Sequence, residues 1–340
     1  MVTAVHKRTI AVMIAALSSV FFVMAGSLPA QAQTIGLRQS ARLALNYLAT
    51  QQLPDGSMND SASVTEDYIF GATAAGRNPN LLISSSGNSV YTFLASPTSG
   101  ATTTANRTGK LAQALVAGRR NPTNFAGQNI LGLLEGPGGT AGGFYNPATG
   151  DFFDNDGGSV NPAFEQANAI LGLVAAHNPA YPVPAKAVTA LLSLQDPNGG
   201  WSADGTDNTN STAMALMALA AVGVHSADQA AFAFLHTQQD PATGGFFFAT
   251  TGAFPSSASD PDSDALVIQG LVAAGQHPGG AAWTINGRNA LTDIRTFQDL
   301  QPGADFGGFS FTLGGAPDSF TTSQVPAGLL KSPFPILPRY

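Results

Sequence analysis

Three aspartates, Asp260, Asp262 and Asp264, stand at alternate positions directly before an apolar run over residues 265–274. A carboxylic acid donates a proton at neutral pH only where burial or a neighbouring carboxylate raises its pKa. Aspartates at a helix start also have a structural use, because they accept backbone N–H groups and favour the helix dipole. The pattern therefore indicates either an acid site or a helix that begins with Asp262 as its N-cap.

A second acidic cluster, formed by Asp151, Asp154 and Asp156, lies beside a Gly-rich stretch and offers oxygen ligands to calcium. Its spacing differs from that of an EF-hand loop, which needs a Glu later in the loop. We therefore expect no cofactor, and we keep calcium at these three aspartates as the alternative.

The composition excludes several classes of protein. The chain has no cysteine, which removes thiolate nucleophiles and Cys-ligated zinc. It has 14 Lys and Arg against 21 Asp and Glu, a formal net charge of −7. Because an acidic chain repels nucleic acid, we expect no nucleic-acid partner. The composition does not indicate an oligomeric state.

The first 32 residues have the features of a signal peptide. A short basic start at His6, Lys7 and Arg8 precedes an apolar run over residues 10–26, and Ala30 and Ala32 provide the small residues of a cleavage site. We expect cleavage after Ala32 and a secreted or periplasmic protein, in which residues 33–340 form a single domain. No later segment is long and apolar enough to span a membrane.

The elements that position the acidic residues follow from an internal repeat. A small-residue helix that ends in Gly or Ala, often followed by a cation and then Pro, recurs through the chain. Gly and Pro stop a helix, and the cation favours the negative end of its dipole. These stops divide the chain into six units, at about 36–79, 80–122, 123–179, 180–226, 227–278 and 279–333.

Each unit has room for two helices of different character. The second helix of several units, as at 167–176, 213–223 and 265–275, is apolar nearly all round, which is typical of a helix buried on every side. The first helix of each unit carries polar residues, which predicts that it is half exposed. We therefore predict an all-α fold, an α/α toroid of six hairpins and about twelve helices in an inner and an outer ring.

The turn within the units carries a further pattern. Gln195, Gly199 and Trp201 are spaced as QxxxGxW, and Gln52 with Gly56 repeats that spacing. Phe246 and Phe309 occupy the aromatic position in two further turns, and Gly142-Gly143-Phe144 is a looser copy. We expect the Gly to make the turn, the aromatic residue to fill the gap between hairpins, and the Gln amide to bond exposed helix-end groups.

This repeat resembles that of the squalene-cyclase and prenyltransferase family of toroids, which also includes exported single-ring cobalamin carriers. In class II terpene cyclases a DxDD motif supplies the initiating proton, so the resemblance implies Asp262 as proton donor, with Asp260 matching and Ser263 in place of the last Asp. The zinc of protein prenyltransferases needs a Cys, which this chain lacks. Export argues against isoprenoid cyclisation, since isoprenoids are made inside cells.

The starts of the inner helices should converge on one rim. Its polar residues are candidate ligand contacts: Glu66, Asp67, Glu165, Gln166, Asn210, Thr212 and Gln324. We predict that the ring binds an apolar or amphipathic small molecule, or a protein partner, at its mouth. One alternative is a terpene-cyclase-like enzyme using Asp262. Another is a carbohydrate-active enzyme in which Glu66 or Glu165 pairs with Asp262 as acid and base.

Overall fold

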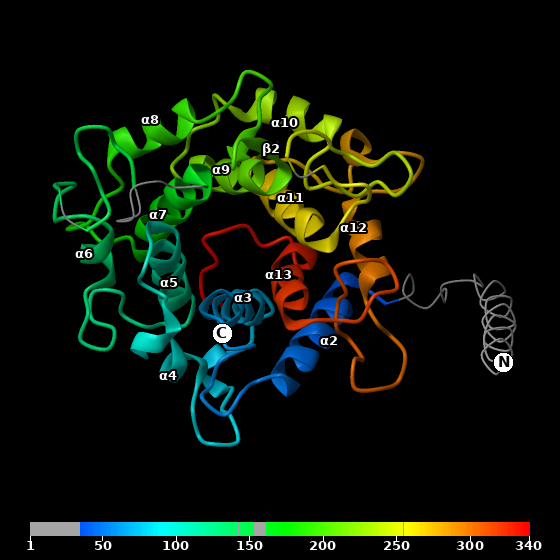
Figure 1. Cartoon of the computed structure of the whole chain (residues 1–340), viewed down its shortest axis with the longest axis horizontal. Helices are drawn as coiled ribbons and strands as arrows, with labels where there is room; N and C mark the ends of the chain where they lie inside the picture. The colour runs from blue at the N-terminus through cyan, green and yellow to red at the C-terminus, as the bar shows by residue number, and fades with distance from the viewer. Residues whose placement is uncertain (1–34, 142, 153–160, 254) are drawn as a thin grey trace, which may run out of the picture.

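A computed structural model describes residues 35–141, 143–152, 161–253 and 255–340 (Figure 1). The expected signal peptide lies outside these residues. Within them the body is helical, with one short antiparallel hairpin formed by β1 (Trp201–Ala203) and β2 (Thr206–Asn208). None of the helices in the described ranges combines the length and hydropathy needed to span a bilayer.

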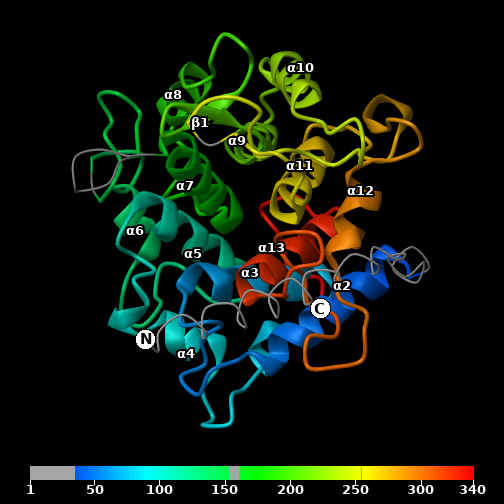
Figure 2. The same ribbon diagram turned by 45° about the vertical axis from the view of Figure 1, so that its right-hand side comes forward.

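The helices form two concentric layers around a centre (Figures 1 and 2). The inner layer consists of α3 (Ala62–Ala74), α5 (Ala105–Ala117), α7 (Pro162–Ala176), α9 (Thr209–Ala221), α11 (Pro261–Ala273) and α13 (Ser319–Leu329). The outer layer consists of α2 (Leu37–Thr50), α4 (Val90–Leu94), α6 (Ile130–Leu134), α8 (Ala185–Ser193), α10 (Asp228–Thr237) and α12 (Ala290–Asp293). Short 3-10 turns are η1 (Pro79–Leu81), η2 (Pro97–Ser99), η3 (Ala281–Trp283) and η4 (Ile294–Phe297).

The ring is closed. Each inner helix packs against the next, and α13 packs against both α3 and α2. Across this junction the Gln298 side chain accepts from the Ser40 hydroxyl at 2.6 Å and donates to the Ser40 carbonyl at 3.0 Å. The predicted α/α toroid of about twelve helices is therefore confirmed.

Small residues allow the inner helices to approach one another. A Cβ on Gly328 of α13 would lie 2.6 Å from Ala265 Cα of α11, and a Cβ on Gly172 of α7 would lie 2.8 Å from the Gly109 carbonyl of α5. Side-chain atoms do not approach backbone that closely, so only glycine fits these crossings. The apolar, small composition of the inner helices thus follows from backbone-to-backbone packing.

The repeated turns lie within the units, between the outer and the inner helix, and contact the outer helix of the next unit. Gly56, Gly199 and Gly307 have φ between +94° and +97°, which favours glycine. The Gln195 amide donates to the Gly199 carbonyl at 3.0 Å and to the carbonyl of Ala227, the N-cap of α10, at 3.3 Å. Trp201 is buried, and its indole N–H donates to the Leu191 carbonyl at 2.8 Å.

The third unit differs from the prediction. Its turn is Asn146-Pro-Ala-Thr-Gly150-Asp-Phe152 and not Gly142-Gly143-Phe144, because Tyr145 pairs with Phe152 as Gln239 pairs with Phe246. Gly150 has φ of +91°, like the turn glycines of the other units. The sequence indicates the position of this turn, since Pro-Ala-Thr-Gly occurs at both 147–150 and 241–244.

Replacing Gly307 by Ala should destabilise the ring at its closing junction. Its φ is +94°, and a Cβ would lie 2.6 Å from the Leu43 carbonyl of α2. We expect a loss of about 2 kcal/mol in the free energy of unfolding, measured by urea denaturation. The matched control is Gly303→Ala in the same loop, where a Cβ meets nothing within 4 Å. Equal losses in the two variants would contradict this account of closure.

Candidate functional site

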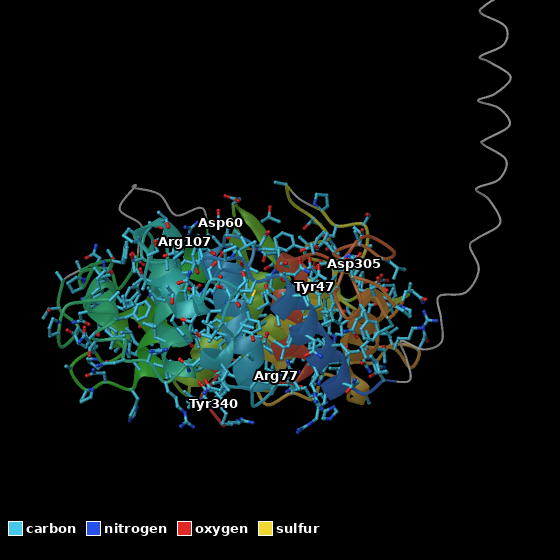
Figure 3. All side chains as sticks on the ribbon, turned by 90° about the horizontal axis from the view of Figure 1, so that it is seen from below. Tyr47, Asp60, Arg77, Arg107, Asp305 and Tyr340 are labelled. Atoms are coloured by element: carbon cyan, nitrogen blue, oxygen red, sulfur yellow. The ribbon has the colours of Figure 1, made fainter. Side chains whose placement is uncertain are left out.

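A cavity of about 260 Å³ opens where the inner helices begin, and all six of them line it. Its lining consists of Ser63, Asp67, Phe70, Asn106, Lys110, Phe164, Asn168, Asn210, Met214, Leu266, Gln269, Phe320, Gln324 and Phe334. In the side view of Figure 3, Arg107 at the start of α5 marks this face of the disc, and Arg77 and Tyr340 lie on the opposite face. The cavity is therefore the mouth of the ring.

Part of the cavity has a polar lining, called the collar here, which consists of Ser63, Asp67, Asn106, Lys110 and Asn168. The Lys110 ammonium lies 2.8 Å from an Asp67 carboxylate oxygen and donates to the Ser63 hydroxyl at 2.7 Å. Burial raises the pKa of Asp67, and the Lys110 charge opposes that rise. Asn168 donates to Asn106 at 2.7 Å. The charges of the collar are thus paired, and its amides offer both donors and acceptors.

Apolar side chains line the cavity beside the collar as well as below it, since Met214 and Leu266 stand six residues after their N-caps, as Asp67 and Lys110 do. Phe70, Met214 and Leu266 are buried side chains of α3, α9 and α11. The Phe334 ring meets Phe70 edge to face, with centroids 4.8 Å apart. Two further aromatic residues, Phe164 and the 51 % exposed Phe320, stand nearer the opening. This arrangement suits a molecule with a polar end and an apolar end.

The three aspartates of α11 have three different environments. Asp260 is the N-cap, since its carboxylate accepts the Ser263 N–H and the Ser263 hydroxyl, both at 2.8 Å. This corrects the expectation that Asp262 caps the helix. Burial raises the pKa of Asp260 to about 6, against these hydrogen bonds.

Asp264 belongs to the scaffold of the repeat. Its carboxylate accepts the Phe246 N–H at 2.7 Å. At the same position of their helices, Thr65, Thr212 and Thr322 accept the N–H of Met58, Trp201 and Phe309 respectively. Asp264 therefore performs the task of a threonine hydroxyl. Burial, with Asp293 nearby, raises its pKa well above the ordinary value.

Asp262 is the remaining acid. It is 5 % exposed, and its Oδ1 atom has no hydrogen-bond partner among the described residues. Burial raises its pKa well above the ordinary value, and the charges of Asp260, Asp318 and Asp67 act in the same direction. It is absent from the cavity lining, although it stands one helical turn before Leu266, which lines it. Asp262 thus lies buried at the rim, with one carboxyl oxygen unbonded and a raised pKa.

The other predicted contacts divide between the mouth and the scaffold. Asp67, Asn210 and Gln324 line the cavity, whereas Glu66, Glu165, Gln166 and Thr212 do not. Gln166 accepts the Phe152 N–H at 2.8 Å, as Thr212 does for Trp201. Prediction from the sequence omitted Lys110, Asn168, Gln269 and Phe334.

Glu66 lies buried on α3 beside α5, with an exposed fraction of 1 %. Burial raises its pKa to about 8, although Lys110 and Arg107 oppose the shift. Its Oε1 atom has no hydrogen-bond partner among the described residues. Glu66 is therefore a buried acid with a raised pKa, next to the collar but outside the cavity lining.

Of the three aspartates proposed to bind calcium, one lies in the described part of the chain. Asp151 is exposed in the third-unit turn, and Asp154 and Asp156 lie outside the described residues. The described ranges contain no cluster of three acidic, His or Cys residues able to hold a metal. Calcium at this loop stays a prediction.

Comparison with known proteins supports the fold alone. No protein-family model and no curated protein matches the chain. A structure of a protein from Actinoplanes matches 87 % of this chain and 99 % of its own, with 18 % identity and a TM-score of 0.50. The type II terpene cyclase MstE from Scytonema, without ligand, matches 87 % of this chain and 98 % of its own, with 15 % identity and a TM-score of 0.50. The resemblance predicted from the repeats is confirmed at the level of fold.

Proposed function

We propose that this chain is an exported toroid that binds a small amphipathic molecule at the mouth of the ring, with its apolar part directed inward. The observation that carries the proposal is the cavity of about 260 Å³, which residues from all six inner helices line with both polar and apolar side chains. Its volume is close to the lower end, about 300 Å³, of ordinary small-molecule sites. Export rests on the signal-peptide pattern of the first 32 residues.

The acid chemistry of the two alternatives has less support. A proton donor must reach the reacting atom. Asp262, Glu66 and Glu165 are not among the residues that line the cavity, and Asp260 and Asp264 bond to backbone of their own unit. A glycosidase also needs two carboxyl groups on either side of a sugar-sized cleft. The described mouth presents one carboxylate, Asp67, which is paired with Lys110.

Filling the mouth tests the proposal. Asn210→Trp places a large side chain at the cavity opening, because Asn210 lines the cavity and is only partly buried. We expect at least a tenfold loss of affinity for octanol, measured by displacement of a fluorescent naphthylamine probe, since the indole takes the space of the ligand.

The matched control is Thr189→Trp, which adds the same side chain at an exposed position of the outer helix α8. We expect it to bind octanol as the unmodified chain does. Unchanged binding in Asn210→Trp, with folding verified by circular dichroism, would show that octanol does not enter this cavity and would overturn the proposal.

A further inference from the structure

The last nine residues of the sequence run through the middle of the ring. After α13 ends at Leu329, residues 332–340 cross the space enclosed by the inner helices, seen as the red coil at the centre of Figure 1. Tyr340 then lies on the face opposite the mouth, as Figure 3 shows. A segment of the chain therefore occupies the axis of the ring.

This C-terminal segment, residues 332–340, touches inner helices on several sides of the ring. Gln269 of α11 donates to the Ser332 carbonyl at 2.8 Å. The Phe334 ring packs on Phe70 of α3, and the Phe334 N–H points to the sulfur of Met217 in α9 at 3.4 Å. Phe334 also lines the mouth cavity. Phe334 thus forms part of the cavity wall, and the segment continues from it to the opposite face, where Tyr340 lies.

The far end of the segment is anchored at α5. The Tyr340 hydroxyl donates to the Ala117 carbonyl at 2.7 Å, and the Arg119 guanidinium lies 5.0 Å from the centre of the Tyr340 ring. Ile336 is buried, whereas Leu337 is 52 % exposed. The contacts in the centre are therefore apolar, and the polar contacts lie at the two ends.

The segment is joined to the ring by few backbone hydrogen bonds. Within the described residues, no backbone–backbone hydrogen bond involves residues 333–340. Pro333, Pro335 and Pro338 have no N–H to donate, so the segment cannot add to a helix or a sheet. An apolar molecule could replace it without leaving many buried amides unsatisfied. Segments with few backbone bonds also open at lower free energy than packed helices.

We propose that the C-terminal segment is a displaceable occupant of the ring, and that the ligand class is a long single hydrocarbon chain with a neutral polar head. This inference rests on the proposed function. The head binds in the collar, where the Lys110 charge is already paired with Asp67 and the Asn amides serve a hydroxyl. The hydrocarbon passes the position of Phe334 and takes the place of residues 334–336.

The proposal predicts how affinity depends on the length of the hydrocarbon chain of the ligand. Each buried methylene strengthens binding by about fourfold. In the full chain this gain should stop once the ligand reaches Phe334, because further methylenes must displace a segment that competes intramolecularly. Without the segment, the gain should continue with length.

The test compares octanol, dodecanol and hexadecanol by displacement of a naphthylamine probe. The proteins are the full chain, a variant that ends at Lys331, Phe334→Ala, and the control Leu337→Ala at the exposed position. Because Phe334 itself lines the cavity, the hexadecanol affinity of each protein is expressed relative to its own octanol affinity, and we expect octanol to bind the full chain and Leu337→Ala within twofold. Hexadecanol should bind the shortened variant at least tenfold more tightly than the full chain, with Phe334→Ala between them and Leu337→Ala equal to the full chain.

A second measurement uses the full chain alone, so it tests the inference even if the shortened variant does not fold. Saturating hexadecanol should accelerate hydrogen exchange of the Phe334 amide, which points to the Met217 sulfur, and of the amide of the buried Ile336, and octanol should leave both unchanged. Equal hexadecanol affinity with and without the segment, or exchange that hexadecanol does not accelerate, would overturn the inference while octanol binding upholds the proposed function. Failure of octanol to bind the full chain would overturn both.

Discussion

Replacing Glu66 by Gln should remove a large part of the pH dependence of this protein's stability. Burial raises the pKa of Glu66 from 4.5 to about 8. Between these values the folded chain keeps a proton that the unfolded chain releases, so the free energy of unfolding falls as pH rises. The stability is fully present below pH 4.5 and is lost through pH 8. Since a tenfold change in proton affinity is about 1.4 kcal/mol, the loss reaches about 5 kcal/mol.

The glutamine side chain of this variant would have nearly the shape of the neutral acid and no proton to lose. We therefore expect Glu66→Gln to match the unmodified chain near pH 4 and to exceed its unfolding free energy above pH 8, as measured by urea denaturation across the pH range. Asp305→Asn, at an exposed position on the mouth side of the disc, is the control and should leave the pH profile unchanged. Parallel profiles for Glu66→Gln and the unmodified chain would contradict the burial argument.

The fold was predictable because its rules are local and repeated. Each helix stop, each turn glycine and each all-apolar inner helix occurs several times, so one weak copy does not hide the period. The third-unit turn was misplaced because Tyr145 stands where other units have Gln, and Asp151 precedes the aromatic Phe152. A search for the literal repeat Pro-Ala-Thr-Gly would have placed it.

The site was only half predictable because the polar residues at each inner-helix start divide between two faces of the helix, of which one lines the cavity. Lining residues lie three or four apart on one face, as Asn106 with Lys110 and Asn210 with Met214 do. Residues at the position of Thr212 point instead to the turn of their own unit. Counting from the N-cap separates the two sets, since the side chain two residues after the cap faces the mouth in most units, as in Asn106 and Asn210.

The C-terminal segment could not be predicted from the repeat. It lies beyond the last unit, has no periodicity, and combines prolines with apolar residues that indicate neither helix nor strand. Its position depends on an empty apolar space at the centre of a closed ring, which exists only once all the hairpins are assembled. A property of the whole assembly of this kind leaves no local signal.

Replacing Asp264 by Thr and by Val should show whether its carboxyl group has a structural or a chemical role. Thr would keep an acceptor for the Phe246 N–H, as Thr65, Thr212 and Thr322 do for their own turns. It would also remove a buried carboxyl whose pKa is raised by burial and by Asp293. We therefore expect Asp264→Thr to be more stable than the unmodified chain at pH 8, where ionisation of the unfolded carboxyl opposes folding.

Val has a similar shape to Thr but no acceptor, so Asp264→Val should leave the buried Phe246 N–H unsatisfied. Its unfolding free energy should lie up to about 3 kcal/mol below that of Asp264→Thr. Both variants should bind octanol like the unmodified chain, because Asp264 is absent from the cavity lining. If Asp264→Thr folded but lost binding, the carboxyl would be a functional group, and its equivalence to the threonines of the other units would be wrong. If Val and Thr were equally stable, the hydrogen bond to Phe246 would not hold the turn, and the aspartate would need another reason to be buried there.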